Sequence, residues 1–341
     1  MTMADIGSDI AAAAAPLLAK SGVVAPYRFQ AIAGGGNNRV YRVESATATI
    51  LLKAYFRHPD DPRDRLTADY GFSRFAWDVG VRALPRPLAE DREAGMAAYE
   101  FVEGRKLVAE EVTDQRVDEA LAFFRDVNDH RGDPREIEVP SASEACFTIV
   151  DHLGCVERRF ERLRGIDPGS PSGVQAVDLV EGRMRPAWCR VRAAVAAGSA
   201  SGDEPLTAGN RCLSPSDFGF HNALLAADGR LRFLDFEYAG WDDPAKMVCD
   251  FFCQPALPAP RGTMASFVEA VARLSRAPEA FVARAALLMP VYELKWCCIM
   301  LNEFLPAADR RRTFAGAAAG QGERRAAQLA KVEAALNRMG A

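Results

Sequence analysis

Hydrophobic and polar positions follow two different patterns in this chain, one before and one after residue 103. In the first part, short apolar runs at residues 32–43, 49–55 and 96–102 are separated by turn-forming residues, which is typical of β-strands. Residues 65–77 carry apolar side chains at helical spacing, and residues 1–15 are also predicted to form a helix. The first part is therefore predicted to be a small sheet with helices.

After residue 103 the apolar positions recur with the period of an α-helix. Residues 114–130 and 323–338 are predicted helices, and a capping-box spacing at Ser141 and Glu144 predicts another that runs to about residue 164. The apolar stretch 285–301 contains Pro290, Glu293 and Lys295, so we expect a core helix and no membrane span. The pattern predicts an α+β fold with two parts, residues 1–102 and 103–341.

The most informative polar residues lie around a predicted hairpin in the second part. Asp228 and Gly229 are a signal for a two-residue turn joining two apolar runs. Asp217 stands five residues before Asn222, and Asp235 ends the second run. Each residue alone fits a polar surface turn. Three of them at this spacing favour the catalytic loop of a kinase.

The chemistry of phosphoryl transfer explains these residue types. The reaction needs an aligned hydroxyl and neutralised charge on the phosphate oxygens more than it needs covalent catalysis. Asp217 would accept the proton of the attacking hydroxyl. Asn222 and Asp235 would supply oxygen ligands to Mg²⁺, a hard cation.

On these residues the chain resembles the aminoglycoside phosphotransferase and choline kinase families. Their pattern is His-x-Asp-x4-Asn, then Asp-x-Glu-x-Ala, then Asp-Pro, and this chain matches it at Asp217, Asn222, Asp235, Glu237, Ala239, Asp243 and Pro244. Pro215 replaces the family histidine, and Met247 replaces a later family aspartate. The resemblance implies a protein-kinase-like fold with two lobes, ATP and Mg²⁺ as cofactors, and a hydroxyl of a small molecule as acceptor.

The resemblance also implies a nucleotide site in the first part. Gly34, Gly35 and Gly36 would bring the backbone close to phosphates, although alone they fit an ordinary hairpin loop. Lys53 interrupts an apolar strand and would hold phosphates, paired with an acid on the next helix; an exposed edge-strand lysine is the alternative. The remaining candidates are the acid Asp69 and the backbone of Glu100, Phe101 and Val102, which would bind the purine.

The acceptor pocket is predicted from acidic and aromatic side chains that follow the catalytic loop. The candidates are Glu237, Trp241, Asp242, Glu293 and Trp296. Carboxylates with aromatic rings suit a cationic acceptor such as an amino sugar, choline or ethanolamine. Core packing and helix capping explain the same residues equally well, and a neutral sugar, amino acid or nucleoside acceptor stays open.

Two other classes of function remain open from the sequence. Pro215 and Asp69 fit a degenerate kinase that binds nucleotide without turnover, whereas intact Lys53, Asp217 and Asp235 oppose it. A protein kinase acting on Ser or Thr is disfavoured, because Glu237 stands where the Asp-Phe-Gly motif has glycine.

Composition and charge narrow the setting. The chain has 341 residues, 49% of them hydrophobic and 26% charged, which suits a globular protein with a substantial core. A net charge of −4 gives no basic field for nucleic acid. We expect a cytoplasmic protein, because the N-terminal segment lacks the features of a secretion signal, and eight reduced, mostly buried cysteines with no structural metal.

Overall fold

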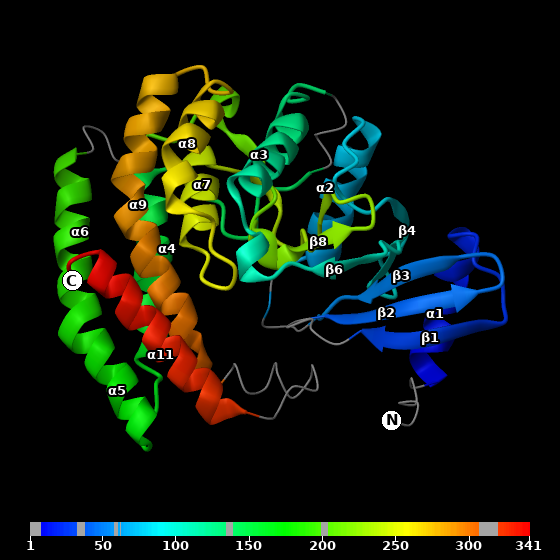
Figure 1. Ribbon diagram of the computed structural model, residues 1–341, viewed down its shortest axis with the longest axis horizontal. Helices are drawn as coiled ribbons and strands as arrows, with labels where there is room; N and C mark the ends of the chain where they lie inside the picture. Colours follow the sequence, from blue (N-terminus) through cyan, green and yellow to red (C-terminus); the bar gives the residue numbers. More distant parts are fainter. Residues whose placement is uncertain are drawn as a thin grey trace.

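The computed structural model describes residues 8–32, 38–57, 61, 63–133, 139–198, 204–306 and 320–341. A five-stranded antiparallel sheet forms within the first hundred residues, and helices dominate the remainder (Figure 1). The predicted α+β class is confirmed. The three glycines Gly34, Gly35 and Gly36 lie outside the described residues.

The large sheet has the strand order β1-β2-β3-β5-β4. Its strands are β1 (Tyr27–Ile32), β2 (Arg39–Ser45), β3 (Thr49–Ala54), β4 (Pro87–Asp91) and β5 (Met96–Glu100). The helices α1 (Ser8–Lys20) and α2 (Arg65–Asp78) both contact β4 and β5. The predicted strands at 49–55 and 96–102 and the predicted helix at 65–77 are confirmed, with small shifts at their ends.

Strand alternation decides which helix each side chain of the sheet meets. Met96 and Ala98 pack with α1, whereas Ala97 and Tyr99 pack with Leu66 of α2, because successive strand residues point to opposite faces. On β3, Leu52 belongs to the α1 side. Lys53 is its neighbour and therefore faces α2.

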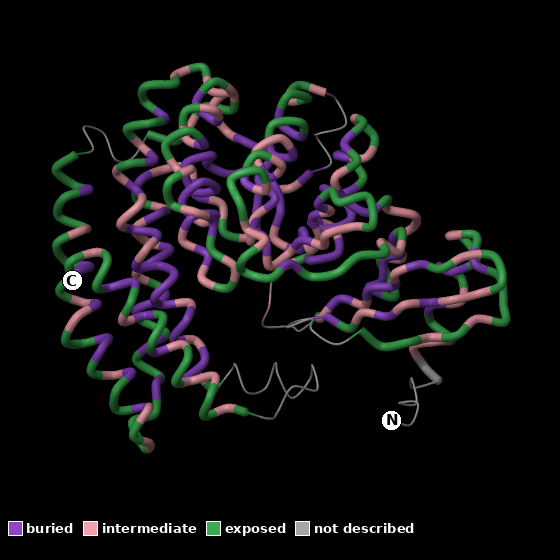
Figure 2. The backbone as a smooth tube through the Cα atoms, viewed as in Figure 1, coloured by how far each residue is buried: buried purple, intermediate pink, exposed green. Residues whose placement is uncertain are grey.

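The helical part is built around one long central helix. Its members are α3 (Asp114–Asn128), α4 (Ile149–Leu163), α5 (Pro171–Leu179), α6 (Arg185–Gly198), α7 (Pro244–Cys253), α8 (Met264–Ala272), α9 (Pro278–Leu301) and α11 (Gln321–Arg338). A π-helical segment, Val180–Met184, joins α5 to α6. Helix α9 contacts α4, α6, α7, α8 and α11, and Figure 2 shows buried positions along it.

Helix α9 is long and apolar enough by composition to cross a membrane. Within the protein, however, 61% of its most apolar window is buried against the other helices. Its apolar side chains are therefore accounted for by packing, as expected for a core helix.

Two small sheets lie within the second part of the chain. Strand β6 (Gly104–Lys106) pairs with β8 (Ala223–Ala226), which pairs with β9 (Leu231–Phe233). Strand β7 (Cys212–Ser214) pairs with β10 (Gly240–Asp242). The predicted hairpin is confirmed, but its turn has three residues, because Ala226 bonds to Arg230 and Gly229 takes the left-handed conformation at φ 75°.

One predicted helix start is wrong. Ser141 does not cap a helix but forms an isolated bridge to Trp241. Helix α4 begins at Ile149, where Thr148 and Asp151 form the capping box. Residues 141–144 have the spacing of a capping box, but their backbone pairs with another segment instead of starting a helix. The amides of Ala142 and Ser143 donate to the carbonyls of Trp241 and Tyr238.

Candidate active site

The loop between β7 and β8 holds an unusual backbone. Among the described residues, three non-glycine residues have positive φ: Ser216 at 43°, Asp217 at 44° and Asp235 at 68°. A left-handed conformation costs such residues about 1–2 kcal/mol each, and strain of this kind gathers at functional sites. All three lie in the stretch that the sequence marks as a catalytic loop.

The loop is anchored from the adjacent helix. Asn128 of α3 accepts a bond from the amide of Leu213 (2.9 Å) and donates one to its carbonyl (3.0 Å). The amide of Ser216 donates to Oγ of Ser214 at 3.2 Å. These bonds fix the segment that leads into Asp217.

Asn222 and His221 surround Asp217. Nδ2 of Asn222 donates to the backbone carbonyl of Asp217 at 3.1 Å and to its Oδ2 at 3.4 Å. Nε2 of His221 lies 3.3 Å from the other carboxylate oxygen. The Asp217 side chain is 36% exposed, so a ligand can reach it.

The structure brings Asp235, Lys53 and Asp69 together. Nζ of Lys53 donates to Asp235 and to Oδ2 of Asp69, the latter at 2.6 Å. Asp69 also accepts from the Tyr55 hydroxyl (2.8 Å) and from the amide of Phe236 (3.2 Å). The shorter aspartate therefore reaches the lysine, and it also holds the segment that carries Asp235.

The electrostatics of this group keep its charges in place. Burial would lower the pKa of Lys53, but the carboxylates of Asp235, Asp69 and Glu237 raise that pKa above its usual value. Burial would likewise raise the pKa of Asp235, yet the charge and hydrogen bond of Lys53 leave it below its usual value. Both side chains are thus charged at neutral pH.

The side chains of Asn222 and Asp235 have the chemistry of a donor set for Mg²⁺. The amide of Leu234 donates to the carbonyl of Asn222 at 2.8 Å, which holds Asn222 next to the segment of Asp235. A carboxylate and an amide oxygen match a hard cation that keeps several waters and binds phosphate oxygens. The described residues include no cluster of three or more His, Cys, Asp or Glu that could hold a metal by itself. The pair therefore fits a cation shared with a phosphate ligand.

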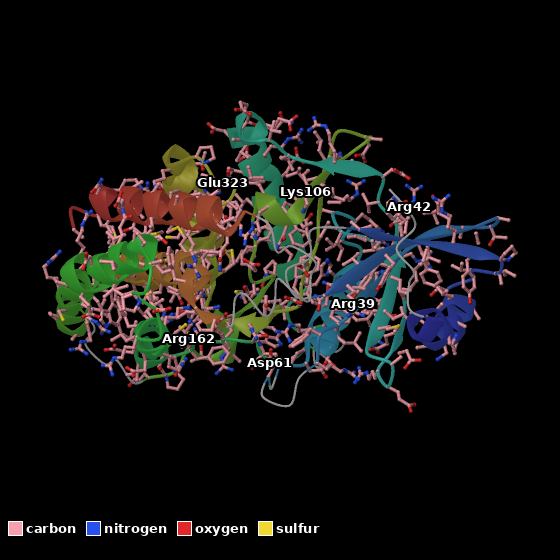
Figure 3. All side chains as sticks on the ribbon, turned by 90° about the horizontal axis from the view of Figure 1, so that it is seen from below. Arg39, Arg42, Asp61, Lys106, Arg162 and Glu323 are labelled. Carbon is pink, nitrogen blue, oxygen red and sulfur yellow. The ribbon has the colours of Figure 1, made fainter. Side chains whose placement is uncertain are left out.

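Lys106 is a site residue that the sequence analysis missed. Its Nζ donates to the carbonyl of His221 at 2.7 Å, and it lies between the sheet and the helical part (Figure 3). Burial lowers the pKa of Lys106, while the charge of Asp235 opposes that change. Because 115 residues separate Lys106 from His221, no local spacing marks it. The pairing of β6 with β8 brings it there.

Glu237 is buried among internal partners. It is 2% exposed and accepts a bond from Nδ2 of Asn38 at 2.5 Å, while Nε of Arg65 lies 3.6 Å away. Its carboxylate joins the first part of the chain to the segment after β9. The expectation that Glu237 contacts an acceptor is thus corrected: its partners are internal.

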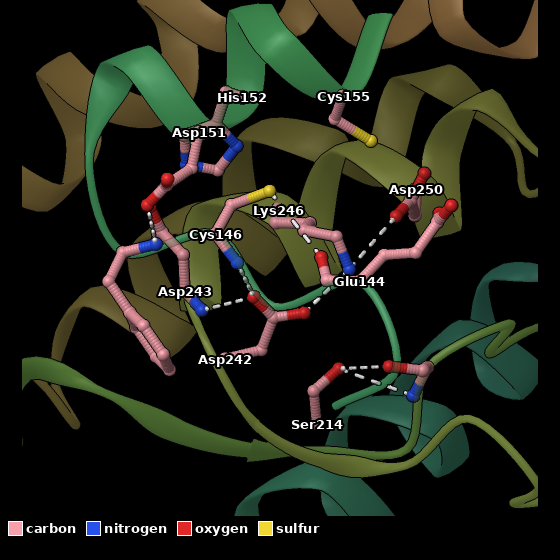
Figure 4. A network of polar contacts seen from close by, with 12 residues as sticks. Glu144, Cys146, Asp151, His152, Cys155, Ser214, Asp242, Asp243, Lys246 and Asp250 are labelled. Atoms are coloured by element: carbon pink, nitrogen blue, oxygen red, sulfur yellow. Dashed lines mark hydrogen bonds and ion pairs between the residues drawn. The ribbon is translucent and has the colours of Figure 1, made fainter. Parts of the chain in front are cut away.

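Trp241 and Asp242 cannot line the same pocket, because they are consecutive residues of β10 and point to opposite faces. Asp242 has no exposed surface; it accepts from the amides of Cys146 and Asp243 and pairs with Lys246 at 2.5 Å (Figure 4). Trp241 lines a separate cavity on the other face. Neither position suits an acceptor held at Asp217.

Glu293 and Trp296 are both on α9, and each has a protein partner. Glu293 accepts from Arg261 at 2.9 Å, and Nε1 of Trp296 donates to Asp250 at 2.8 Å. Trp296 is 8% exposed. Both side chains therefore keep only a small part of their surface exposed for contact with a ligand.

The predicted purine-binding backbone is partly occupied. The amide of Glu100 donates to the carbonyl of Arg86 at 2.8 Å within the sheet, so it is not available to a base. Phe101 and Val102 follow the end of β5. The ring of Phe101 lies under the Arg42 guanidinium at 4.6 Å.

Taken together, the fold and the site define a phosphotransferase. A model of the Phosphotransferase enzyme family matches residues 28–266, most of the chain, and the chain belongs to this family. No curated protein matches the sequence significantly.

Solved structures share the fold at low sequence identity. A spectinomycin phosphotransferase, APH(9)-Ia, has 10% identity and a TM-score of 0.60 over 94% of this chain and 96% of its own. A choline kinase from Cryptosporidium parvum has 12% identity and a TM-score of 0.54, covering 92% and 90%. A choline/ethanolamine kinase family protein from Mesorhizobium loti has 21% identity and a TM-score of 0.52, covering 96% and 97%. The predicted family and protein-kinase-like fold are confirmed.

Proposed function

We propose that this protein transfers the γ-phosphoryl group of ATP, with Mg²⁺, to a hydroxyl of a small molecule. The observation that carries the proposal is the strained loop at Ser216 and Asp217, which presents an exposed carboxylate beside Asn222. At the same site, the Lys53 ammonium forms ion pairs with Asp69 and with Asp235. A purely structural loop would have no need for strained, charged residues here.

Each side chain then has a defined task. Asp217 orients the acceptor hydroxyl and accepts its proton. The acceptor can reach this carboxylate because the side chain is 36% exposed. Asn222 and Asp235 would hold Mg²⁺, which neutralises charge on the phosphate oxygens. Lys53 and Lys106 would bind phosphate oxygens, and Asp69 keeps Lys53 oriented.

The two parts of the chain would divide the work. Residues 1–102 form the nucleotide lobe, with Gly34, Gly35 and Gly36 near the phosphates and the backbone at Phe101 and Val102 near the purine. Residues 103–341 form the helical lobe with the acceptor. The pairing of β6 with β8 supports a division just before Gly104. We also propose a cytoplasmic location.

The acceptor class is narrowed by the corrected pocket. Glu237 and Asp242 are buried and engaged inside the protein, whereas the Glu293 side chain keeps 14% of its surface exposed beside Arg261, so we retain Glu293 and its helix neighbour Trp296 as acceptor contacts. Related structures include a spectinomycin phosphotransferase and a choline kinase, which makes amino sugars, choline, ethanolamine and neutral sugars the first acceptors to test.

The test of the proposed nucleotide and metal site is a binding measurement. Isothermal titration with Mg·ADP should show saturable binding to the wild-type chain, weakened roughly tenfold or more in Asp235→Asn, because one anionic ligand to the cation is lost. The exposed helix variant Asp126→Asn is the control. Binding of Mg·ADP that is equal in all three proteins would reject the assignment of Asp235.

A further inference from the structure

A second cavity lies on the face of β10 opposite the buried Asp242. Its volume is about 760 Å³, within the range of small-ligand pockets, and it is bounded by the ends of α3 and α8 and by residues 208–211. Four arginines line it: Arg131, Arg211, Arg273 and Arg276. Among the described lining residues, Asp129 is the one acid.

The two inner arginines are held by backbone carbonyls. Arg131 donates to the carbonyls of Asn128 (3.1 Å), Arg211 (2.8 Å) and Leu274. Arg211 donates from Nε to Leu206 at 3.0 Å, and its guanidinium lies 4.1 Å from the centre of the Phe147 ring. These bonds fix both side chains without neutralising their charge.

The two outer arginines are exposed at the mouth of the cavity. The Arg276 guanidinium lies against Gly209, where an added Cβ would stand 2.9 Å from Nε. Within the described parts of the chain, none of the four arginines forms an ion pair with a carboxylate. The cavity is thus lined by four positive charges and one acid, so a bound anion would reduce the mutual repulsion of the arginines.

We propose that this cavity binds a phosphate-bearing small molecule. Guanidinium groups bind phosphate oxygens with two parallel hydrogen bonds, which the exposed Arg273 and Arg276 can offer, while the fixed Arg131 and Arg211 add positive charge to the wall. Trp241, half-buried in the wall, supplies an apolar surface for the remainder of the ligand. The site is separate from the proposed catalytic one, because Lys53, Asp217, Asn222 and Asp235 do not line it.

The ligand would sit against the strand that leads to the catalytic loop. Arg131 bonds to the carbonyl of Arg211 directly before β7, and Trp241 pairs with Leu213 within β7. The proposal itself concerns binding and does not depend on phosphotransfer.

The test follows the indole N–H signals of the tryptophans by ¹⁵N NMR during titration with inorganic pyrophosphate at constant ionic strength. The Trp241 signal, assigned with Trp241→Phe, should shift saturably. Trp77, Trp188 and Trp296 lie outside the cavity lining and serve as internal references. The double variant Arg273→Gln/Arg276→Gln should weaken binding roughly tenfold or more, because two charge-assisted donors are lost.

The matched control is Arg158→Gln/Arg190→Gln, which removes two exposed arginines from α4 and α6 and should leave the affinity unchanged. Equal affinity in the two double variants would overturn the proposal. So would a Trp241 signal that does not move, because pyrophosphate bound only at Lys53 leaves that indole in place. Neither outcome bears on phosphotransfer, which is measured separately.

Discussion

At the scale of single residues, the site is marked by backbone strain at charged and polar side chains. Ser216, Asp217 and Asp235 hold positive φ although none is glycine. The sequence spacing identifies Asp217 and Asp235, but it contains no sign of their backbone conformation. Strain of this kind is maintained by surrounding bonds, and before Asp217 these are the bonds that the amides of Leu213 and Ser216 donate to Asn128 and Ser214.

The strain at Ser216 can be measured as stability. Ser216→Gly should raise the free energy of unfolding by roughly 0.5–1 kcal/mol, because glycine adopts positive φ without a steric cost. The same substitution at Ser266, inside α8, should lower it by about 0.5–1 kcal/mol. Urea unfolding measures both, and a loss of stability at both positions would contradict the assigned strain.

Substitutions of Asp69 test whether its ion pair with Lys53 stabilises the fold. Asp69→Ala should lower the free energy of unfolding by about 3 kcal/mol, because it leaves buried Lys53, the Tyr55 hydroxyl and the Phe236 amide without this partner. Asp69→Asn keeps an accepting oxygen and should cost about 1–2 kcal/mol. The exposed control Asp126→Ala should stay within about 0.5 kcal/mol of wild type. Equal losses of unfolding free energy at positions 69 and 126 would show that Asp69 does not stabilise the fold.

At the scale of elements, the sequence pattern predicted the helices and the turn whose formation depends on neighbouring residues. Helices α2 and α3 and the β8–β9 hairpin follow from apolar spacing and from Gly229. The start of α4 did not follow from the local pattern, because Ser141 pairs with Trp241 of β10, one hundred residues away in the sequence. A motif of four residues contains no information about such a contact.

The same distinction applies to the candidate site. Asp217, Asn222 and Asp235 lie close in sequence, so their spacing is visible there. Lys106 and Asn38 meet the site across 115 and 199 residues, and only the pairing of distant elements brings them together. The acceptor residues were misplaced for a related reason, because residues 240–242 form a strand only by pairing with the distant β7, and in that strand Trp241 and Asp242 point to opposite faces.

The buried ion pair between β10 and α7 predicts a non-additive pair of substitutions. Lys246→Met alone should cost about 3–5 kcal/mol, because it leaves Asp242 buried without its cation. Burial raises the pKa of Asp242 despite Lys246, so the charged pair itself is expensive to bury. The double variant Asp242→Asn/Lys246→Met should therefore recover at least half of the loss. A strictly additive result in urea unfolding would contradict this coupling.

At the scale of the whole molecule, the contacts between the two parts gather on one short segment. Lys53 meets Asp235, Asp69 meets the amide of Phe236, and Asn38 meets Glu237. Residues 235–237 thus accept bonds from β3 and from the residue before β2, and they donate one to α2. A ligand bound at Asp235 would act on both parts of the chain together.

Acid should unfold the protein through its paired carboxylates. Burial would raise the pKa of Glu144, but Arg159, Lys295 and Lys246 lower it to about 2, and His152 and Arg284 similarly lower that of Asp243. A carboxyl with a depressed folded pKa adds stability above its unfolded pKa of about 4 and loses it as the pH falls toward the folded value. The urea midpoint should therefore be flat from neutrality to about pH 5 and fall steeply below about pH 4.

Glu144→Gln should reduce that acid slope, because it removes one of the titrating groups. Glu157→Gln, which removes the exposed pair of Arg192, provides the control for a lost surface ion pair. A slope unchanged by Glu144→Gln, or reduced equally by both, would contradict the role of Glu144.

The most direct test of the central claim asks whether Asp217 supports phosphoryl transfer. Purified protein is incubated with Mg·ATP and a mixture of small hydroxyl compounds, and mass spectrometry identifies any compound that gains a phosphoryl group. We predict one such product with the wild-type chain and with Asp126→Asn. With Asp217→Asn the rate should fall by about 10²–10³ or more while Mg·ADP still binds. Full product formation by Asp217→Asn, or no product and no nucleotide binding by the wild-type chain, would contradict the account.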